Sequence, residues 1–248
     1  MGIKERRTKI LLSLFLLSDV NLSSVNLDER IQKVFDLTFN QKTRGTISAM
    51  IKDQLIEKKS DQSDNHEYSL TFKGFTELCL EFPYFRYLKE KWDKKWRILS
   101  YEIPEKKRDL RDKLRREVSG WGLGPWHRSF WLTPHPIIDS LKSLVSQQEE
   151  EKYLQAFEAE HVFGDREILI EKVWNKSQLD KKYRELFKNW HDILSSESDK
   201  LAKLTKVVSD YVTLLREDPG LPVELVGESW IGFEAFNIFK EIRSILLS

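Results

Sequence analysis

The sequence predicts an α+β protein built from three consecutive parts, and three observations support this prediction. The chain has 248 residues, which is long for one compact domain and comfortable for two or three. Helix-like and strand-like hydrophobic patterns alternate in the first 174 residues, and helical patterns fill the rest. Hydrophobic residues make up 40% of the chain and eight residues are tryptophan, so sizeable cores can form. We place the parts at residues 1–88, 89–174 and 175–248.

The first part has the pattern of three helices and a hairpin. Asn26 and Glu29 form a capping box that starts the second helix, which ends near Thr38. The third helix turns Ile47, Met50 and Ile51 inward. The expected elements are helices over 6–18 and 41–54, strands over 55–59 and 67–72, and a turn over 60–65. This order, with short links, is typical of a winged helix-turn-helix.

The apolar run at residues 10–17 follows several basic residues and has some features of a secretion signal. It is short, it lacks a small-residue cleavage site, and it ends at Ser18-Asp19. It is also too short to span a membrane. We therefore interpret it as a buried first helix. The single cysteine, Cys79, excludes an intramolecular disulfide framework, so we expect a cytoplasmic protein.

The start of the predicted third helix carries residues suited to DNA. In a helix-turn-helix the second helix of the motif enters the major groove with its leading residues. Arginine and lysine bond guanine edges, glutamine bonds adenine, and threonine bonds phosphates or bases. The candidate DNA-binding residues are Gln41, Lys42, Thr43, Arg44 and Thr46. Residues 1–60 carry eleven basic and seven acidic side chains, which favours phosphate binding. The alternative is a solvated helix face, and the acidic turn at 60–65 is a poor phosphate ligand.

The second part alternates strands and helices in the order of a ferredoxin-like sandwich. A strand over 96–104 stops at a proline, and a charged helix follows over 105–119 with Leu110, Leu114 and Val118 at a spacing of four. Gly120 ends that helix. A strand at 127–132, a helix at 137–148, and strands at 153–162 and 166–173 complete the pattern. The third part is helical.

Three groups of motifs resemble the PaaX family of bacterial repressors. The first two lie in the central part and the third in the C-terminal part. They comprise Trp96, Ile103-Pro104-Glu105, Arg108 and Arg111-Asp112-Lys113-Leu114-Arg115; Gly122-Leu123-Gly124 and Trp131-Leu132-Thr133-Pro134; and Leu179, Tyr183, Phe187, Asp218-Pro219-Gly220-Leu221-Pro222-Val223-Glu224-Leu225, Trp230, Gly232, Ala235 and Phe239. One departure is Gln54, where the family usually has a glycine before the hairpin.

The resemblance implies a homodimeric repressor that binds double-stranded DNA and is released by a small anionic effector such as an acyl-CoA. It implies neither a membrane partner nor a cofactor, and no catalytic residue. The effector pocket cannot be carried over residue by residue.

The central part also resembles the small ferredoxin-like nuclease subunit of CRISPR spacer-acquisition machinery. In that family an aspartate at the end of the first strand binds a divalent metal, and the matching residue is Glu102. The alternative function is therefore a metal-dependent nuclease or CRISPR-associated protein. We favour a strand-end carboxylate paired with Lys106, Lys107 or Arg108, because no second catalytic group accompanies it.

Other features of the central part are open to more than one interpretation. Residues 86–116 hold thirteen basic and six acidic side chains, which could extend a DNA footprint, bind an anionic effector or form a solvated helix face. We interpret His127 and His135 as surface histidines rather than metal ligands. Trp121, Trp126 and Trp131 fit a core or a dimer interface better than an effector wall. The run of glutamates at 149–151 is most simply a solvated helix end or loop.

Overall fold

The computed structural model describes residues 2–60, 66–118, 120–127 and 129–248. Most of the turn predicted at 60–65 therefore lies outside the described residues, as do Ser119 and Arg128 at the ends of two predicted elements. The structure is mixed α+β, with two antiparallel sheets. The chain forms two compact units, each assembled from separated segments. Unit 1 comprises Met1–Cys79, Tyr183–Leu214 and Gly232–Ser248, and unit 2 comprises Leu80–Lys182 and Leu215–Ile231.

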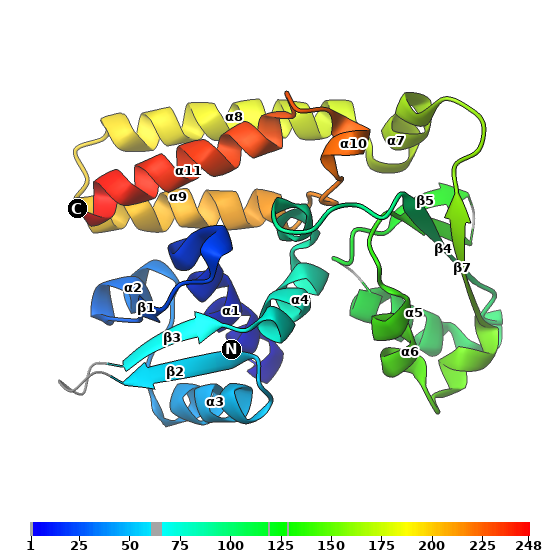
Figure 1. Cartoon of the computed structure of the whole chain (residues 1–248), viewed down its shortest axis with the longest axis horizontal. Helices are drawn as coiled ribbons and strands as arrows, with labels where there is room; N and C mark the ends of the chain where they lie inside the picture. Colours follow the sequence, from blue (N-terminus) through cyan, green and yellow to red (C-terminus); the bar gives the residue numbers. More distant parts are fainter. Residues whose placement is uncertain (1, 61–65, 119, 128) are drawn as a thin grey trace. The chain divides into compact units, whose positions relative to one another are not determined.

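Unit 1 combines an N-terminal helix-and-hairpin region with long C-terminal helices. Its sheet has the order β1-β3-β2, with Lys58 of β2 opposite Tyr68 of β3. Its elements, four of which extend into unit 2 at one end, are α1 (Ile3–Ser18), η1 (Asp19–Asn21), β1 (Val25–Asn26), α2 (Glu29–Val34), α3 (Gln41–Lys52), β2 (Ile56–Ser60), β3 (His66–Leu70), α4 (Phe72–Glu81), α8 (Lys176–Ser195), α9 (Lys200–Leu215) and α11 (Ile231–Leu247) (Figure 1).

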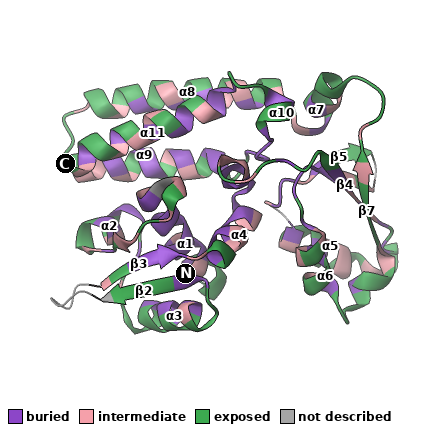
Figure 2. Ribbon diagram, viewed as in Figure 1, coloured by how far each residue is buried: buried purple, intermediate pink, exposed green. Residues whose placement is uncertain are grey.

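Helix α1 lies at the centre of the N-terminal core of unit 1. Ile10, Leu14 and Phe15 are fully buried, and most of the helix is coloured as buried in Figure 2. The apolar run at 10–17 is thus a buried helix, as predicted. Within the described residues, no helix is long and apolar enough to cross a membrane.

An aromatic cluster joins the three long helices of unit 1. The rings of Trp190 on α8 and Tyr211 on α9 lie 5.4 Å apart between centroids, edge to face. The ring of Phe239 on α11 lies 4.9 Å from that of Tyr211. All three side chains are buried. Arg243 of α11 also donates a hydrogen bond to the carbonyl oxygen of Leu16 on α1, so the C-terminal helix is tied to the N-terminal core.

Unit 2 is built around a four-stranded antiparallel sheet of order β5-β6-β4-β7. The two helices α5 and α6 and the strands share one core, in which Leu99 and Tyr101 of β4 pack with Leu114, Val118 and Leu141. The elements are η2 (Pro83–Leu88), β4 (Lys95–Tyr101), η3 (Glu105–Lys107), α5 (Arg108–Val118), β5 (Gly124–His127), β6 (Phe130–Thr133), α6 (Ile138–Val145), η4 (Glu149–Tyr153), β7 (Leu154–Glu160), α7 (Arg166–Trp174) and α10 (Val223–Val226).

Two predicted elements of unit 1 differ from the structure, and one helix was not predicted. The second helix starts two residues later than the capping box indicated, because Asp28 is the N-cap and accepts a hydrogen bond from the Ile31 amide, while Asn26 pairs with Glu67 in the sheet. That helix also ends at Val34 rather than near Thr38. The returning strand stops at Leu70, and the unpredicted helix α4 follows. Gly74 allows this, since a Cβ there would lie 2.0 Å from the Leu55 carbonyl oxygen.

Two predicted strands of unit 2 also differ. Residues 166–173 were predicted as a strand and form helix α7. Asp165 caps this helix by accepting hydrogen bonds from the amides of Glu167 and Ile168, and Asn175 ends it in the left-handed conformation. The single strand predicted at 127–132 is not continuous: β5 ends at His127, and β6, which begins at Phe130, pairs antiparallel with β5.

Candidate functional site

The first turn of α3 is fixed by polar side chains that precede it or lie within it. The side-chain oxygen of Asn40 accepts a hydrogen bond from the Thr43 amide at 3.1 Å, which caps the helix. The Thr43 hydroxyl donates to the Thr38 carbonyl oxygen at 2.6 Å. These bonds hold the connection between α2 and α3 and set the direction in which α3 begins.

A second set of contacts anchors α3 to α1. Ile47 and Met50 are buried in the core of unit 1. The buried guanidinium of Arg6 donates to the Thr46 hydroxyl at 3.3 Å, and that hydroxyl donates to the Lys42 carbonyl oxygen at 2.9 Å. At the other end of α3, Arg7 forms an ion pair with Asp53 at 3.1 Å. One face of α3 is therefore held firmly against the protein.

The five predicted DNA-binding residues divide between the two faces of α3. Gln41, Lys42 and Arg44 are exposed. Thr43 is 1% exposed and Thr46 is 7% exposed, and both hydroxyls bond within the protein. The structure thus leaves three of the five side chains exposed, while the two threonines position the helix.

The exposed face of α3 also contains residues that were not among the candidates. Gly45, Ser48 and Ala49 are exposed, and so is Lys52 at the end of the helix. Small side chains on this face leave room for another molecule to approach the helix backbone. Their spacing from Gln41 is helical, which is the signal that would have found them. Figure 2 shows the exposed residues on α3 and on β2.

The two long basic side chains at the start of this face are those of Lys42 and Arg44. Within the described part of the chain, the side chains of Lys42 and Arg44 form no hydrogen bond or ion pair. Arg44 is close enough to Tyr68 of β3 to act on its phenol: burial raises the pKa of Tyr68, and the charge of Arg44 opposes that shift. The hairpin adds the exposed Lys58 and Lys59 of β2. This face therefore carries several exposed positive charges.

Glu102, the candidate metal ligand, stands apart from other ligating groups. It is exposed just beyond β4, in a shallow hollow that it shares with Ser100, Lys152, Tyr153 and Gln155. Among the described residues there is no group of three or more histidine, cysteine, aspartate or glutamate side chains that could hold a metal ion. Glu102 also forms no ion pair with Lys106, Lys107 or Arg108.

Acidic partners neutralise much of the basic run at 86–116. Lys107 pairs with Glu149, and Lys113 pairs with Glu150 at 2.8 Å. The hydrogen bond from Lys113 holds the pKa of Glu150 below its usual value. Further pairs join Arg111 to Glu105, Arg108 to Asp112, and Arg86 to Glu90. Glu149 and Glu150 thus bind lysines on and just before α5 rather than forming only a solvated loop.

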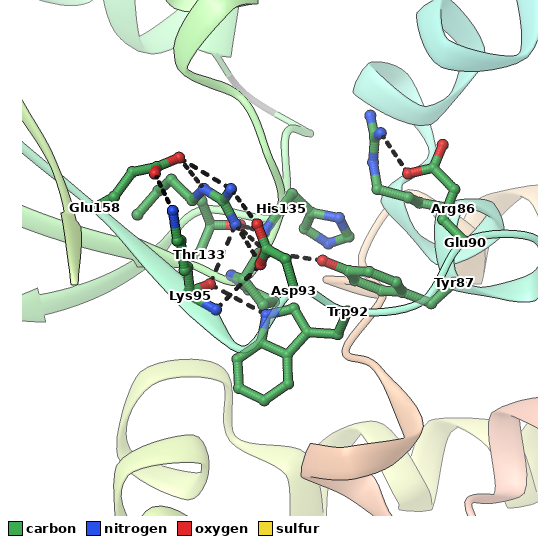
Figure 3. A network of polar contacts seen from close by, with 11 residues as sticks. Arg86, Tyr87, Glu90, Trp92, Asp93, Lys95, Thr133, His135 and Glu158 are labelled. Atoms are coloured by element: carbon green, nitrogen blue, oxygen red, sulfur yellow. Dashed lines mark hydrogen bonds and ion pairs between the residues drawn. The ribbon is translucent and has the colours of Figure 1, made fainter. Parts of the chain in front are cut away.

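A buried polar network in unit 2 was not anticipated (Figure 3). Arg97 of β4 is 4% exposed, and its guanidinium bonds Asp93, Glu158 and the Pro134 carbonyl oxygen. These bonds outweigh desolvation and raise the pKa of Arg97. His135 is 1% exposed, so the prediction that it lies on the surface is wrong; His127 is exposed as predicted.

His135 ties the sheet to the segment around Pro219. Its Nε2 lies 2.7 Å from the Pro219 carbonyl oxygen, and its ring stacks on Tyr87 at 5.0 Å. Gly122, which has a positive φ of 72°, makes room for the ring, since a Cβ there would lie 2.7 Å from it. Burial lowers the pKa of His135 to about 3, so the ring is neutral and Nε2 donates. We interpret this network as structural support.

The three tryptophans near this network differ in exposure. Trp121 is buried in the core of unit 2, and Trp131 packs against that core. Trp126 is 38% exposed. The first two therefore belong to the core, as favoured from the sequence.

Two family models match the chain, and both describe PaaX domains. Residues 89–168 match the PaaX protein central Cas2-like domain, and residues 174–248 match the PaaX-like protein C-terminal domain. Uncharacterized protein Rv0674 from Mycobacterium tuberculosis has a similar solved structure, with a TM-score of 0.52, 17% sequence identity, and coverage of 96% of this chain and 97% of that chain. At this identity the likeness concerns the fold alone. No curated protein matches the chain.

Proposed function

Since the chain belongs to the PaaX family, we propose that it is a sequence-specific DNA-binding transcriptional regulator that acts as a repressor. One observation carries the proposal: α3 is held by its buried face and presents Gln41, Lys42 and Arg44 on the other. The family match supports a regulator, and the position of α3 within unit 1 supports DNA as its partner. The nuclease alternative has no comparable observation in its favour.

The fold assigned to each part belongs to this proposal. Residues 1–88 are a winged helix-turn-helix, in which α2 and α3 form the motif and β2 and β3 form the wing. Residues 89–174 are a ferredoxin-like domain, supported by the order of β4, α5, β5, β6, α6 and β7 along the chain. Residues 175–248 are the helical C-terminal domain.

The exposed side chains of α3 have different roles in the proposed complex. Arg44 bonds a guanine edge, because its guanidinium is exposed and has no other partner in the described chain. Gln41 is placed to bond adenine. Lys42 neutralises a phosphate, together with Lys58 and Lys59 of the wing.

The proposed regulator acts as a homodimer in the cytoplasm. A single winged helix reads a short site, and pairing two copies lengthens the sequence that is read. By family resemblance, an acyl-CoA or another small anionic effector releases the protein from DNA.

The test begins with genome-wide mapping of bound DNA, since the bound promoters supply the operator. Replacing Arg44 by alanine should then weaken operator binding by about 1–3 kcal/mol, roughly 5- to 150-fold, and relax the choice of base at one position. Lys42→Ala should weaken binding to all sequences. It should also reduce the slope of log affinity against log salt concentration by about one.

Lys142→Ala is the matched control, because it removes one exposed positive charge from α6 and leaves α3 intact. It should leave operator affinity within twofold of the parent chain. If Arg44→Ala and Lys142→Ala have equal effects in folded protein, α3 is not the reading helix. If the protein enriches no genomic DNA and binds no duplex, the function itself is refuted.

A further inference from the structure

The outer edge of β7 is an unprotected strand edge. β7 ends the strand order of its sheet and pairs with β4; no other strand of the described chain pairs with it (Figure 1). Its seven residues, Leu154–Glu160, include no proline and no lysine, and the charged residues among them are Glu158 and Glu160. Natural proteins usually protect such edges with charged side chains, especially lysine, with proline or with a bulge, because an open edge can pair with another chain.

The opposite edge of the same sheet shows that protection. β5 contains Gly124 and Pro125, and its register with β6 is irregular between Pro125 and His127. Proline lacks the amide proton that a further strand would need. The two edges of one sheet therefore differ, and only β7 is suited to strand pairing.

Exposed apolar side chains gather along β7. Phe157, in the middle of the strand, is 51% exposed, and Phe130 of β6 is 40% exposed. Both line the same shallow hollow on the sheet. Just beyond the strand, Val162 and Phe163 are 90% and 95% exposed. Exposed apolar side chains gathered in one region of a surface mark sites of protein association.

The sequence of β7 is complementary to itself in antiparallel pairing. In the two-fold register that pairs all seven residues, Phe157 faces its own copy. Glu158 then faces Ala156, and Glu160 faces Leu154, so no like charges oppose each other. Glu158 is also neutralised within its own sheet, at 3.0 Å from both Lys95 and Arg97.

We propose that the partner of this edge is a second copy of the chain. The two β7 strands pair antiparallel about a two-fold axis at Phe157, and two four-stranded sheets become one continuous sheet. This surface is the dimer interface of the proposed regulator, so the inference rests on the proposed function for its biological role. Strand pairing satisfies the backbone groups of both edges at once and covers the exposed Phe157.

Crosslinking through an introduced cysteine tests the axis. Directly opposed residues on antiparallel strands have Cα atoms about 4.5–5.5 Å apart, which suits a disulfide. Phe157→Cys should therefore form a covalent dimer under mild oxidation, and a reductant should reverse it. The parent chain should not crosslink, because its one cysteine, Cys79, is 2% exposed.

Val162→Cys is the control for nonspecific crosslinking. This position is more exposed than Phe157, but its two copies would lie about 33 Å apart in the proposed pairing, at about 3.3 Å per residue. It should give at least tenfold less covalent dimer. Equal crosslinking of the two variants would overturn the proposal, and so would crosslinking of Val162→Cys alone.

A substitution that places a negative charge at the proposed two-fold axis gives a second, independent test of the dimer interface. Phe157→Asp opposes two carboxylates and should convert the dimer to the 29.5 kDa monomer in light scattering at micromolar concentration. Val162→Asp should remain dimeric, and circular dichroism checks that both variants are folded. A parent chain that is monomeric, or a Phe157→Asp variant that stays dimeric, overturns the interface. Parent protein that still binds its operator in that case leaves the proposed function standing.

Discussion

At the scale of single residues, Thr43 shows how a polar side chain on the proposed reading helix can serve the fold. Its hydroxyl donates to the Thr38 carbonyl oxygen, and the side chain is 1% exposed. Helical spacing already separates the faces, because Thr43, Thr46, Ile47 and Met50 fall on one side. The sequence thus contained the signal that the two threonines are buried, and their polarity alone argued for DNA contact.

Thr43→Val should lower stability without changing the DNA contact. Valine keeps the shape of threonine but leaves the Thr38 carbonyl oxygen without its donor, which costs about 1–2 kcal/mol. Urea denaturation measures the loss. Operator affinity, measured where the variant is fully folded, should match that of the parent chain. A tenfold loss of affinity with unchanged stability would show that Thr43 contacts DNA.

His135 makes stability depend on pH. In the unfolded chain it binds a proton below about pH 6.5, whereas burial in the folded protein lowers its pKa to about 3. Protons therefore favour the unfolded state between these values. Its contribution is complete above pH 6.5 and falls as the pH is lowered toward 3, by about 2 kcal/mol between pH 7 and pH 5.

A substitution isolates this effect from other titrating groups. His135→Gln has no proton to bind but retains an amide that can donate to the Pro219 carbonyl oxygen. Its free energy of unfolding should be lower at pH 7 and should fall less steeply toward pH 5. Parallel pH profiles for the two proteins would refute the assignment.

At the scale of elements, prediction succeeded where periodicity and end signals agreed. The charged helix after β4 was predicted because Leu110, Leu114 and Val118 repeat at a spacing of four, and α5 buries two of the three. The prediction of secondary structure failed at α7, where the run Ile168-Leu169-Ile170 has the composition of a strand. Only Ile170 and Val173 are buried there, three residues apart, which is a helical spacing. Its cap at Asp165 was the missed signal.

Asp165→Ala tests whether that cap holds α7. The Asp165 carboxylate accepts from two backbone amides at 2.8 and 3.1 Å, and an N-cap of this kind contributes about 1 kcal/mol. The variant should lose about that amount, and hydrogen exchange should show faster exchange confined to the first turn of α7. Asp165→Asn, which keeps an acceptor, is the control. Equal losses in both variants would mean that charge rather than capping matters.

At the scale of the whole molecule, the order of elements along the chain does not reveal which segments share a core. The three consecutive parts predicted from the sequence stay a proposal. The compact units, in contrast, join segments that are far apart in the chain, with α1 and α11 in one unit. Local periodicity finds each helix, but the bond from Arg243 to Leu16 joins residues 227 positions apart and leaves no local signal.

Because α11 shares a unit with α1 and α3, a destabilising substitution in α11 should also lower the stability of the N-terminal region. Phe239 is 1% exposed and stacks with Tyr211, so Phe239→Ala should cost about 3–5 kcal/mol. Native-state hydrogen exchange should then show reduced protection in α1 and α3 as well as in α9. Ile245→Ala on the same helix is the control, since Ile245 is 64% exposed and its loss should cost less than about 0.5 kcal/mol. Unchanged protection in α1 and α3 after Phe239→Ala would show that the N-terminal region folds independently of the C-terminal helices.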